Sequence, residues 1–120
     1  MNKLILAAGL IAATIPSPAS ATNWVEVARS KDNVIVAWVD ADRIVRGETG
    51  TGIWLRLSIK NNEYAIILMA LRCQSRTYME LKKTFFERNG SSTNVQVSNE
   101  WDFAIPDTVM DVVFDKVCES

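Results

Sequence analysis

Apolar and polar side chains alternate along most of the chain between residues 24 and 97. This period of two residues is typical of β-strands that have one buried face. The alternation predicts strands over residues 24–29, 34–39, 53–59, 63–74 and 77–88, and a short edge strand over residues 95–97. Residues 63–74 are apolar on both sides, which predicts a central strand covered on both faces of the sheet. In the next strand, Met79, Leu81 and Phe85 are expected to share one face.

Turn-forming residues separate these segments. Residues 31–33 and Asn61-Asn62 predict hairpin turns, because Asn tolerates a positive φ. Asn89-Gly90 is the strongest turn signal in the chain. The three glycines at 47, 50 and 52 predict a flexible loop. The pattern leaves open whether the chain turns at Ser75-Arg76 or only bends there.

The period becomes helical after Pro106. Apolar side chains now recur three or four residues apart, at Val109, Met110, Val113, Phe114 and Val117. Asp107 is the predicted N-cap, and Asp107, Asp111 and Asp115 form an acidic stripe on the opposite side of the helix. Because β-branched valines are weak helix formers, we expect docking onto the sheet to stabilise this helix. The predicted fold is α+β, an antiparallel sheet of about five to six strands with one C-terminal helix packed on a face.

The first 21 residues have the features of a cleavable export signal. A positive start at Lys3 is followed by an apolar stretch over residues 4–15 and by Ala19-Ser20-Ala21, which fits the small-x-small rule for signal peptidase. The apolar stretch is too short to cross a bilayer, which needs roughly 20 residues. No cysteine follows it that would take a lipid anchor. We therefore expect residues 22–120 to form a single exported domain, located in the periplasm, in the medium or at the cell surface.

Cys73 and Cys118 are the two cysteines of the chain. Export together with an even cysteine count predicts a disulfide bond, here between a strand and the end of the helix. Closing a loop of this length stabilises a fold by roughly 4 kcal/mol in the chain-entropy treatment. The alternative is a reactive thiol or a redox pair, although neither cysteine belongs to a Cys-x-x-Cys motif.

Composition argues against most catalytic and metal chemistry. The chain has no histidine, which excludes Ser-His-Asp and Cys-His nucleophiles and histidine-containing metal sites. Its 13 basic and 14 acidic residues argue against nucleic acid as a partner. Asp40 and Asp42 are the closest carboxylate pair and would suit acid–base work, but Asp40 is expected to cap a helical turn instead. We predict no enzymatic activity, no cofactor and no metal, with a carboxylate-dependent hydrolase as a minor alternative.

Tryptophan and basic residues are the candidate binding groups. The candidate surface consists of Trp54, Arg56, Arg72, Arg76 and Lys82. By strict alternation, Trp54 falls on the side of the strand opposite Ile53, Leu55 and Leu57, beside Arg56. Trp and Arg are enriched at binding hot spots. By parity, Arg72 and Arg76 are expected to point away from Cys73 and from the helix. The alternative is that these charges are solvated residues balanced by neighbouring glutamates.

The remaining tryptophans are assigned by the same alternation. Trp24 and Trp101 are expected in the core, whereas Trp38, like Trp54, is left open between the core and the surface. An exposed edge strand also offers a route to pairing with a second copy of the chain.

Several landmark residues occur in an order that resembles a known family. They are Trp24-Val25, residues 39–44, Ile53-Trp54, Cys73, Trp101, Ile105-Pro106 and Val117-Cys118. This arrangement resembles the surface-adhesin protein E family of small bacterial envelope proteins. The resemblance implies a sheet with one helix and a disulfide between them, and adhesion to host extracellular-matrix or plasma proteins. The alternative function is a periplasmic accessory or structural subunit, or an inhibitor, that binds another envelope protein.

Overall fold

The computed structural model describes residues 22–119. The predicted export signal, residues 1–21, lies outside the described residues. Over the part that is described, no helix combines the length and the apolar character needed to cross a bilayer. The Cys73–Cys118 disulfide is formed, with 5.7 Å between the two Cα atoms, and such bonds are characteristic of exported proteins.

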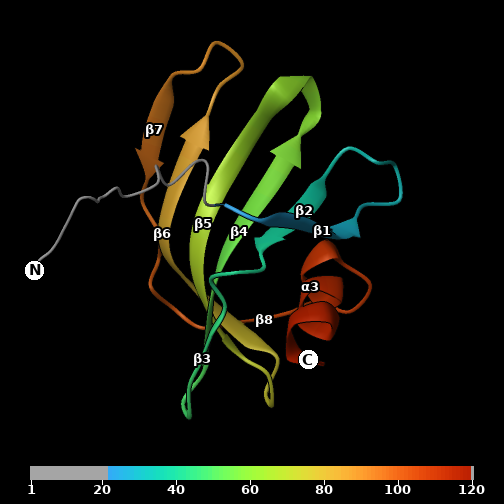
Figure 1. The fold of residues 1–120 in the computed structure, drawn as a ribbon, viewed down its shortest axis with the longest axis vertical. Coiled ribbons are helices and arrows are strands. Elements are labelled where there is room, and N and C mark those ends of the chain that lie inside the picture. The colour runs from blue at the N-terminus through green and yellow to red at the C-terminus, as the bar shows by residue number, and fades with distance from the viewer. Residues whose placement is uncertain (1–21, 120) are drawn as a thin grey trace, which may run out of the picture.

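Residues 22–119 fold into a single antiparallel sheet and one α-helix (Figure 1). The strands are β1 (Trp24–Arg29), β2 (Val36–Asp40), β3 (Val45–Arg46), β4 (Thr51–Ile59), β5 (Glu63–Arg72), β6 (Thr77–Phe86), β7 (Ser92–Val95) and β8 (Asp102–Phe103). The 3₁₀ turn η1 (Lys60–Asn62) joins β4 to β5, and the helix is α3 (Val109–Cys118). The sheet order is β1-β2-β4-β5-β6-β7, with β3 paired to β4 and β8 paired to β6. The predicted α+β fold is confirmed.

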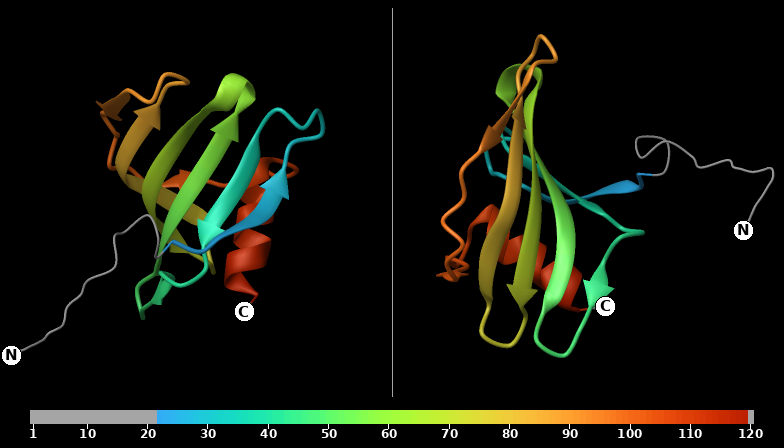
Figure 2. Two further views of the ribbon diagram at one scale, coloured as in Figure 1. Left: turned by 45° about the horizontal axis from the view of Figure 1, so that its top comes forward. Right: turned by 90° about the vertical axis from the view of Figure 1, so that its left-hand side faces the viewer.

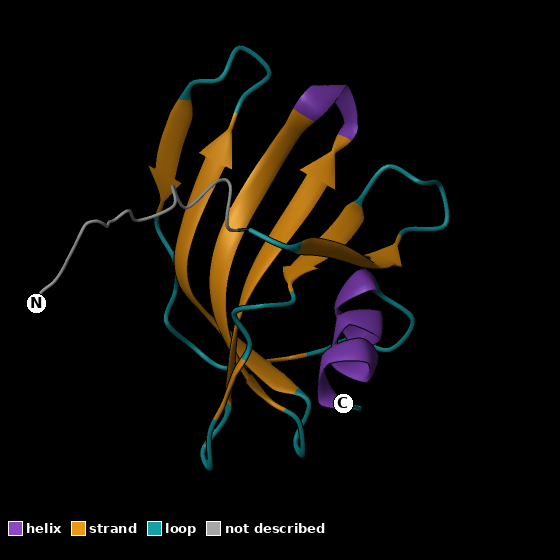
Figure 3. Ribbon diagram, in the orientation of Figure 1, coloured by secondary structure: helices purple, strands orange, loops and turns teal. Residues whose placement is uncertain are grey.

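The helix covers one side of the twisted sheet, against β1 and β2 (Figures 2 and 3). Every second side chain is buried on this side from Thr51 to Leu55 of β4 and from Ala65 to Leu71 of β5, as the alternation requires. The core combines inward residues of the sheet with one face of the helix: Ala28, Ala37, Val39, Ile53, Leu55, Ala65, Ile67, Met69, Leu71, Val113, Phe114 and Val117. Burial of this apolar surface stabilises a helix whose valines would not hold it alone.

Asparagine and glycine form the hairpin turns where the sequence predicts them. Asn33, Asn61 and Asn62 have positive φ angles of 62°, 74° and 63°. Gly90 has a φ of 92°, and the side chain of Asn89 accepts a hydrogen bond of 2.9 Å from the backbone N–H of Ser91. These residues tolerate the left-handed region at low cost, so the hairpin registers are fixed locally.

A bulge in β6 changes which residues share a face. Leu68 of β5 lies opposite Lys82, and Met69 lies opposite Glu80, so Leu81 is an extra residue in the ladder. The prediction that Met79, Leu81 and Phe85 share one face is therefore wrong. Met79 lies opposite Ala70 on one side of the sheet, whereas Phe85 lies opposite Ala65 on the other.

The glycine-containing segment is a hairpin rather than a loop. Val45 pairs with Gly52, and the backbone N–H of Gly47 donates to the carbonyl oxygen of Gly50 at 2.9 Å. The edge strand β7 also lies earlier than predicted, at Ser92–Val95. Two-residue strands such as β3 are too short for alternation to show them.

The helix begins one residue later than the sequence predicts. Thr108 is the N-cap, while Asp107 takes a left-handed φ of 65° directly after Pro106. The backbone N–H of Asp107 donates to the carboxylate of Asp111 at 3.1 Å. The Thr108 hydroxyl donates to the carbonyl oxygen of Ile105 at 2.6 Å rather than accepting from the helix. The prediction of Asp107 as N-cap is wrong because its backbone turns the chain into the helix.

Candidate functional site

The side of the sheet opposite α3 is here called the open face. It is formed by the outward positions of β2, β4, β5 and β6: Trp38, Gly52, Trp54, Arg56, Tyr64, Ile66, Leu68, Ala70, Arg72, Met79, Lys82, Thr84 and Phe86. The aromatic and aliphatic members are half-buried, and Arg72 and Lys82 are exposed. Within the described residues, α3 lies on one side of the sheet and the outward side chains of β5 are only half-buried, so the prediction that β5 is covered on both faces is not met. A sheet face rich in apolar and aromatic side chains remains accessible.

An aromatic stack occupies the end of the open face next to η1, which we call its upper end. The rings of Tyr64 and Phe86 lie parallel, with an interplanar angle of 12° and centroids 4.8 Å apart. The guanidinium of Arg56 lies 4.0 Å from the centroid of the Tyr64 ring, which is a cation–π contact. The three side chains therefore hold one another in place, and their exposed edges form a rigid surface.

Two neighbouring residues of this face have buried donors without acceptors. Trp38 and Arg56 are register partners on β2 and β4. Neither the indole N–H of Trp38 nor Nε of Arg56 has a hydrogen-bond partner among the described residues. A buried donor without an acceptor costs about 1–3 kcal/mol. Both donor atoms are enclosed by neighbouring side chains, so this cost falls on the folded domain itself.

Arg72 and Trp101 meet at the opposite, lower end of the open face, next to the β5–β6 turn. The Arg72 guanidinium lies 3.6 Å from the centroid of the Trp101 ring. Beside them is a hollow of about 320 Å³, whose lining includes Val45, Gly52 and Ala70. Gly52 and Ala70 are register partners, so two small residues form its floor. Sequence reasoning missed this hollow because Val45 and Trp101 reach it from outside the main strands.

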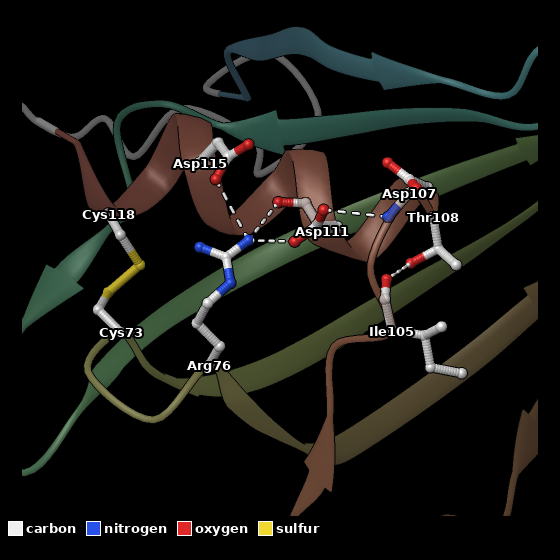
Figure 4. Close-up of polar contacts among 8 residues, drawn as sticks. All are labelled: Cys73, Arg76, Ile105, Asp107, Thr108, Asp111, Asp115 and Cys118. Carbon is white, nitrogen blue, oxygen red and sulfur yellow. Dashed lines mark hydrogen bonds and ion pairs between the residues drawn. A yellow bond between two sulfur atoms is a disulfide. The ribbon is translucent and has the colours of Figure 1, made fainter.

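Arg76 does not belong to the open face, contrary to the prediction (Figure 4). Its guanidinium forms ion pairs with Asp111 and, at 3.2 Å, with Asp115, and donates at 2.9 Å to the carbonyl oxygen of Asp111. The reason is the turn before β6, where Arg76 has a φ of 55° and the parity of the strand is lost. Arg76 lies against the helix, next to the disulfide.

Two carboxylates of the acidic stripe on the helix, those of Asp111 and Asp115, are thus paired with Arg76. The pKa of the Asp111 carboxyl lies below its ordinary value, first because the Asp107 N–H donates to it and second because Arg76 lies beside it. The hydrogen bond to Asp111, together with the negative charges of Asp111 and Asp115, raises the pKa of Arg76. The Cys73–Cys118 bond and the Arg76 ion pairs thus fix the helix to the β5–β6 turn at adjacent points.

The predicted surface residues separate into two groups. Trp54, Arg56, Arg72 and Lys82 share the open face, and Lys82 lies in the same row as Trp54, each opposite Leu68. Arg76 lies on the helix side. The four tryptophans are all half-buried, so Trp24 and Trp101 are less buried than a core position requires. Alternation placed the residues of the regular strand segments correctly and failed at the bulge in β6 and at the turn before β6.

Asp40 is a structural carboxylate. Its side chain is 1% exposed, accepts from the backbone N–H groups of Asn23 at 3.3 Å and Asp42 at 3.2 Å, and pairs with Arg43 at 3.2 Å. The predicted capping role is confirmed, although the capped segment is a turn rather than a helical turn. Residues 22–119 contain no cluster of three or more acidic or cysteine side chains suited to a metal ion.

No family profile, curated protein or solved structure matches this chain. The resemblance to surface-adhesin protein E thus stays a prediction, and the function is inferred from the residues of the chain itself.

Proposed function

We propose that this chain is an exported, non-enzymatic binding domain that holds a protein partner on its open face. The single observation that carries the proposal is the group of aromatic and basic residues on the sheet face opposite the helix. Trp38 and Arg56 form one cross-strand row of this group, and Trp54 and Lys82 belong to the next row. Trp, Tyr and Arg are the residues most enriched at protein-binding hot spots.

Rigidity supports a binding role for this surface. The Arg56–Tyr64–Phe86 stack and the Arg72–Trp101 contact fix side chains that would otherwise lose rotamer freedom on binding. A partner then loses less free energy in ordering the interface. The exposed cations Arg72 and Lys82 favour a protein surface with carboxylates over a purely apolar ligand.

A host matrix or plasma protein is the partner that we propose first, in line with the adhesin resemblance. The domain would act in the periplasm, in the medium or at the cell surface. A bacterial envelope protein is the alternative partner, which would make the chain an accessory subunit or an inhibitor. Both readings use the same surface, so one binding experiment with two sets of partners separates them.

The test immobilises the oxidised domain, residues 22–120, and measures its binding to purified matrix and plasma proteins and to solubilised envelope proteins. We expect saturable binding that falls at least about tenfold for Trp54→Ala, because hot-spot tryptophans contribute 2 kcal/mol or more. Val112→Ala, at an exposed apolar position on α3, is the matched control and should bind as the wild type does. Binding that is unchanged by Trp54→Ala and lost in the control would overturn the proposal.

A further inference from the structure

The hollow at the lower end of the open face is built to admit one side chain. Its floor is Gly52 and Ala70, and its walls include Val45 and Trp101. A Cβ atom placed on Gly52 would meet no atom within 4 Å, so the space above this glycine is free in the described structure. The volume of about 320 Å³ exceeds the roughly 150 Å³ that accommodates benzene in an apolar cavity. A phenyl or branched aliphatic group fits the hollow.

The rim of the hollow carries a fixed, unpaired cation. Arg72 is exposed, its guanidinium is held over the Trp101 ring, and it has no ion-pair partner among the described residues. Arg76, four residues later, is engaged by two carboxylates. Glu48 of the β3–β4 hairpin lines a neighbouring hollow together with Arg72 but forms no ion pair with it. A carboxylate supplied from outside is the natural complement of Arg72.

Charge along the rest of the open face has the same sign. Arg56 and Lys82 likewise have no carboxylate within ion-pair distance among residues 22–119. Two acidic residues at the margin of this face are already paired, Glu26 with Arg29 and Asp40 with Arg43. The face therefore attracts an acidic partner, and it repels the same face of a second copy.

We propose that this hollow is the anchor site for an acidic segment of a partner protein, in which one large apolar side chain is flanked by carboxylates. The apolar side chain enters between Val45 and Trp101, and a flanking carboxylate pairs with Arg72. This inference rests on the proposed function, because it names the chemistry of the partner at the same face. Partner binding would then depend on the space above Gly52 and Ala70 as well as on the aromatic residues of the open face.

The test uses a synthetic probe, acetyl-Gly-Asp-Phe-Asp-Gly-amide, titrated into the ¹⁵N-labelled oxidised domain and followed by ¹H–¹⁵N NMR. Four tryptophans give four indole signals, which report both ends of the open face. We expect saturable shifts that are largest at Trp101 and at Gly52, with a dissociation constant of about 1 mM or tighter. Probes with Lys in place of Asp, or Ala in place of Phe, should produce no saturable shift.

Protein variants then separate the hollow from the rest of the face. Gly52→Phe fills the floor without a backbone clash and introduces no new indole signal, and it should abolish the shifts. Thr93→Phe adds the same side chain at an exposed position of β7 and should leave them unchanged. Arg72→Glu should weaken the probe about fivefold or more, whereas Arg88→Glu, an equal charge change at an exposed loop, should not. An unchanged spectrum of Gly52→Phe away from the site confirms that the variant folds.

Three results would overturn the inference, and the first two would leave the proposed function standing. Shifts confined to Trp38 and Arg56, and unaffected by Gly52→Phe, would show a binding face without this anchor and would leave the proposed function standing. No shift with any probe, while a partner protein binds through Trp54, would have the same meaning. Concentration-dependent shifts of Trp101 without probe, abolished by Phe103→Ala, would show that a second copy fills the hollow, since Phe103 is 71% exposed and follows Asp102.

Discussion

Two arginines four residues apart show how differently the two sides of this sheet are used. Arg76 lies on the helix side, where Asp111 and Asp115 neutralise it beside the Cys73–Cys118 bond. Arg72 lies on the open face, where the described residues give it the ring of Trp101 and no carboxylate. The same residue type is thus a structural element on one side and an available binding group on the other.

The contrast extends to the apolar residues of the strands. Inward residues in the middle of β4 and β5 are almost fully buried, with Leu55 and Leu71 at 0% exposed, whereas their outward neighbours such as Trp54 and Leu68 are half-buried. The inward set stabilises the fold. The outward set keeps part of its apolar surface in water. Burial of that surface by a partner would contribute free energy to binding.

The two sides should differ most in the free energy of unfolding that is lost when a phenylalanine is replaced by alanine. Phe114→Ala removes a ring that is 0% exposed and should lower the free energy of unfolding by about 3–5 kcal/mol. Phe86→Ala removes a half-buried ring of the open face and should cost about 1–2 kcal/mol, mainly from lost stacking on Tyr64. Urea unfolding of both variants measures the difference. Equal losses would contradict the assignment of the core to the helix side alone.

Removal of the disulfide should cause the next largest loss in the free energy of unfolding. Cys73 and Cys118 are 45 residues apart in sequence, and replacing both by Ala should lower the free energy of unfolding by about 2–4 kcal/mol. The helix should be affected first, since the bond holds its last turn. Urea unfolding and far-ultraviolet circular dichroism measure both effects. Reducing agent should produce the same loss in the wild type and none in the double variant.

The two arginines themselves provide a matched pair. Arg76→Ala removes the ion pairs to Asp111 and Asp115 and should lower the urea midpoint, though by less than loss of the disulfide. Arg72→Ala has no ion pair to lose and should change the midpoint by still less. The order reverses for partner binding, where Arg72→Ala should weaken binding and Arg76→Ala should not. Loss of binding in both variants would indicate that both arginines contact the partner.

The smallest expected effect is a pH dependence of the helix side. The folded-state pKa of Asp111 lies below 3.8, its ordinary value, so its contribution to stability is present above that pH and is lost as the pH falls through the folded-state pKa. The stability difference between the wild type and Asp111→Asn should therefore be constant near neutral pH and shrink in acid below pH 3.8. Urea midpoints at a series of pH values measure it. A difference that grows in acid would contradict this linkage.

Sequence patterns predicted the fold where the backbone is regular. Alternation located the five longer strands, and the three-to-four residue period located Val113, Phe114 and Val117 on the buried side of the helix. Patterns failed where the backbone departs from regularity. The bulge at Leu81 reverses the faces of β6, and the positive φ of Arg76 turns its side chain toward the helix.

The candidate site was predicted in part for the same reason. Trp54 and Arg56 lie in the middle of a regular strand, so their parity places them on the open face together. Trp101 lies in a segment without regular structure, and its contact with Arg72 depends on how the chain returns from β7 to β8. Three-dimensional packing, rather than local propensity, decides such contacts.

One measurement tests the central claim most directly. The partner protein retained by the oxidised domain is added to the ¹⁵N-labelled domain, and the ¹H–¹⁵N spectrum is compared with that of the free domain. Binding through the open face predicts that the indole signals of Trp38, Trp54 and Trp101 broaden or shift while the exposed residues of α3, such as Val112, stay unchanged. Perturbation confined to α3 and the β5–β6 turn would contradict the account and would assign binding to the helix side.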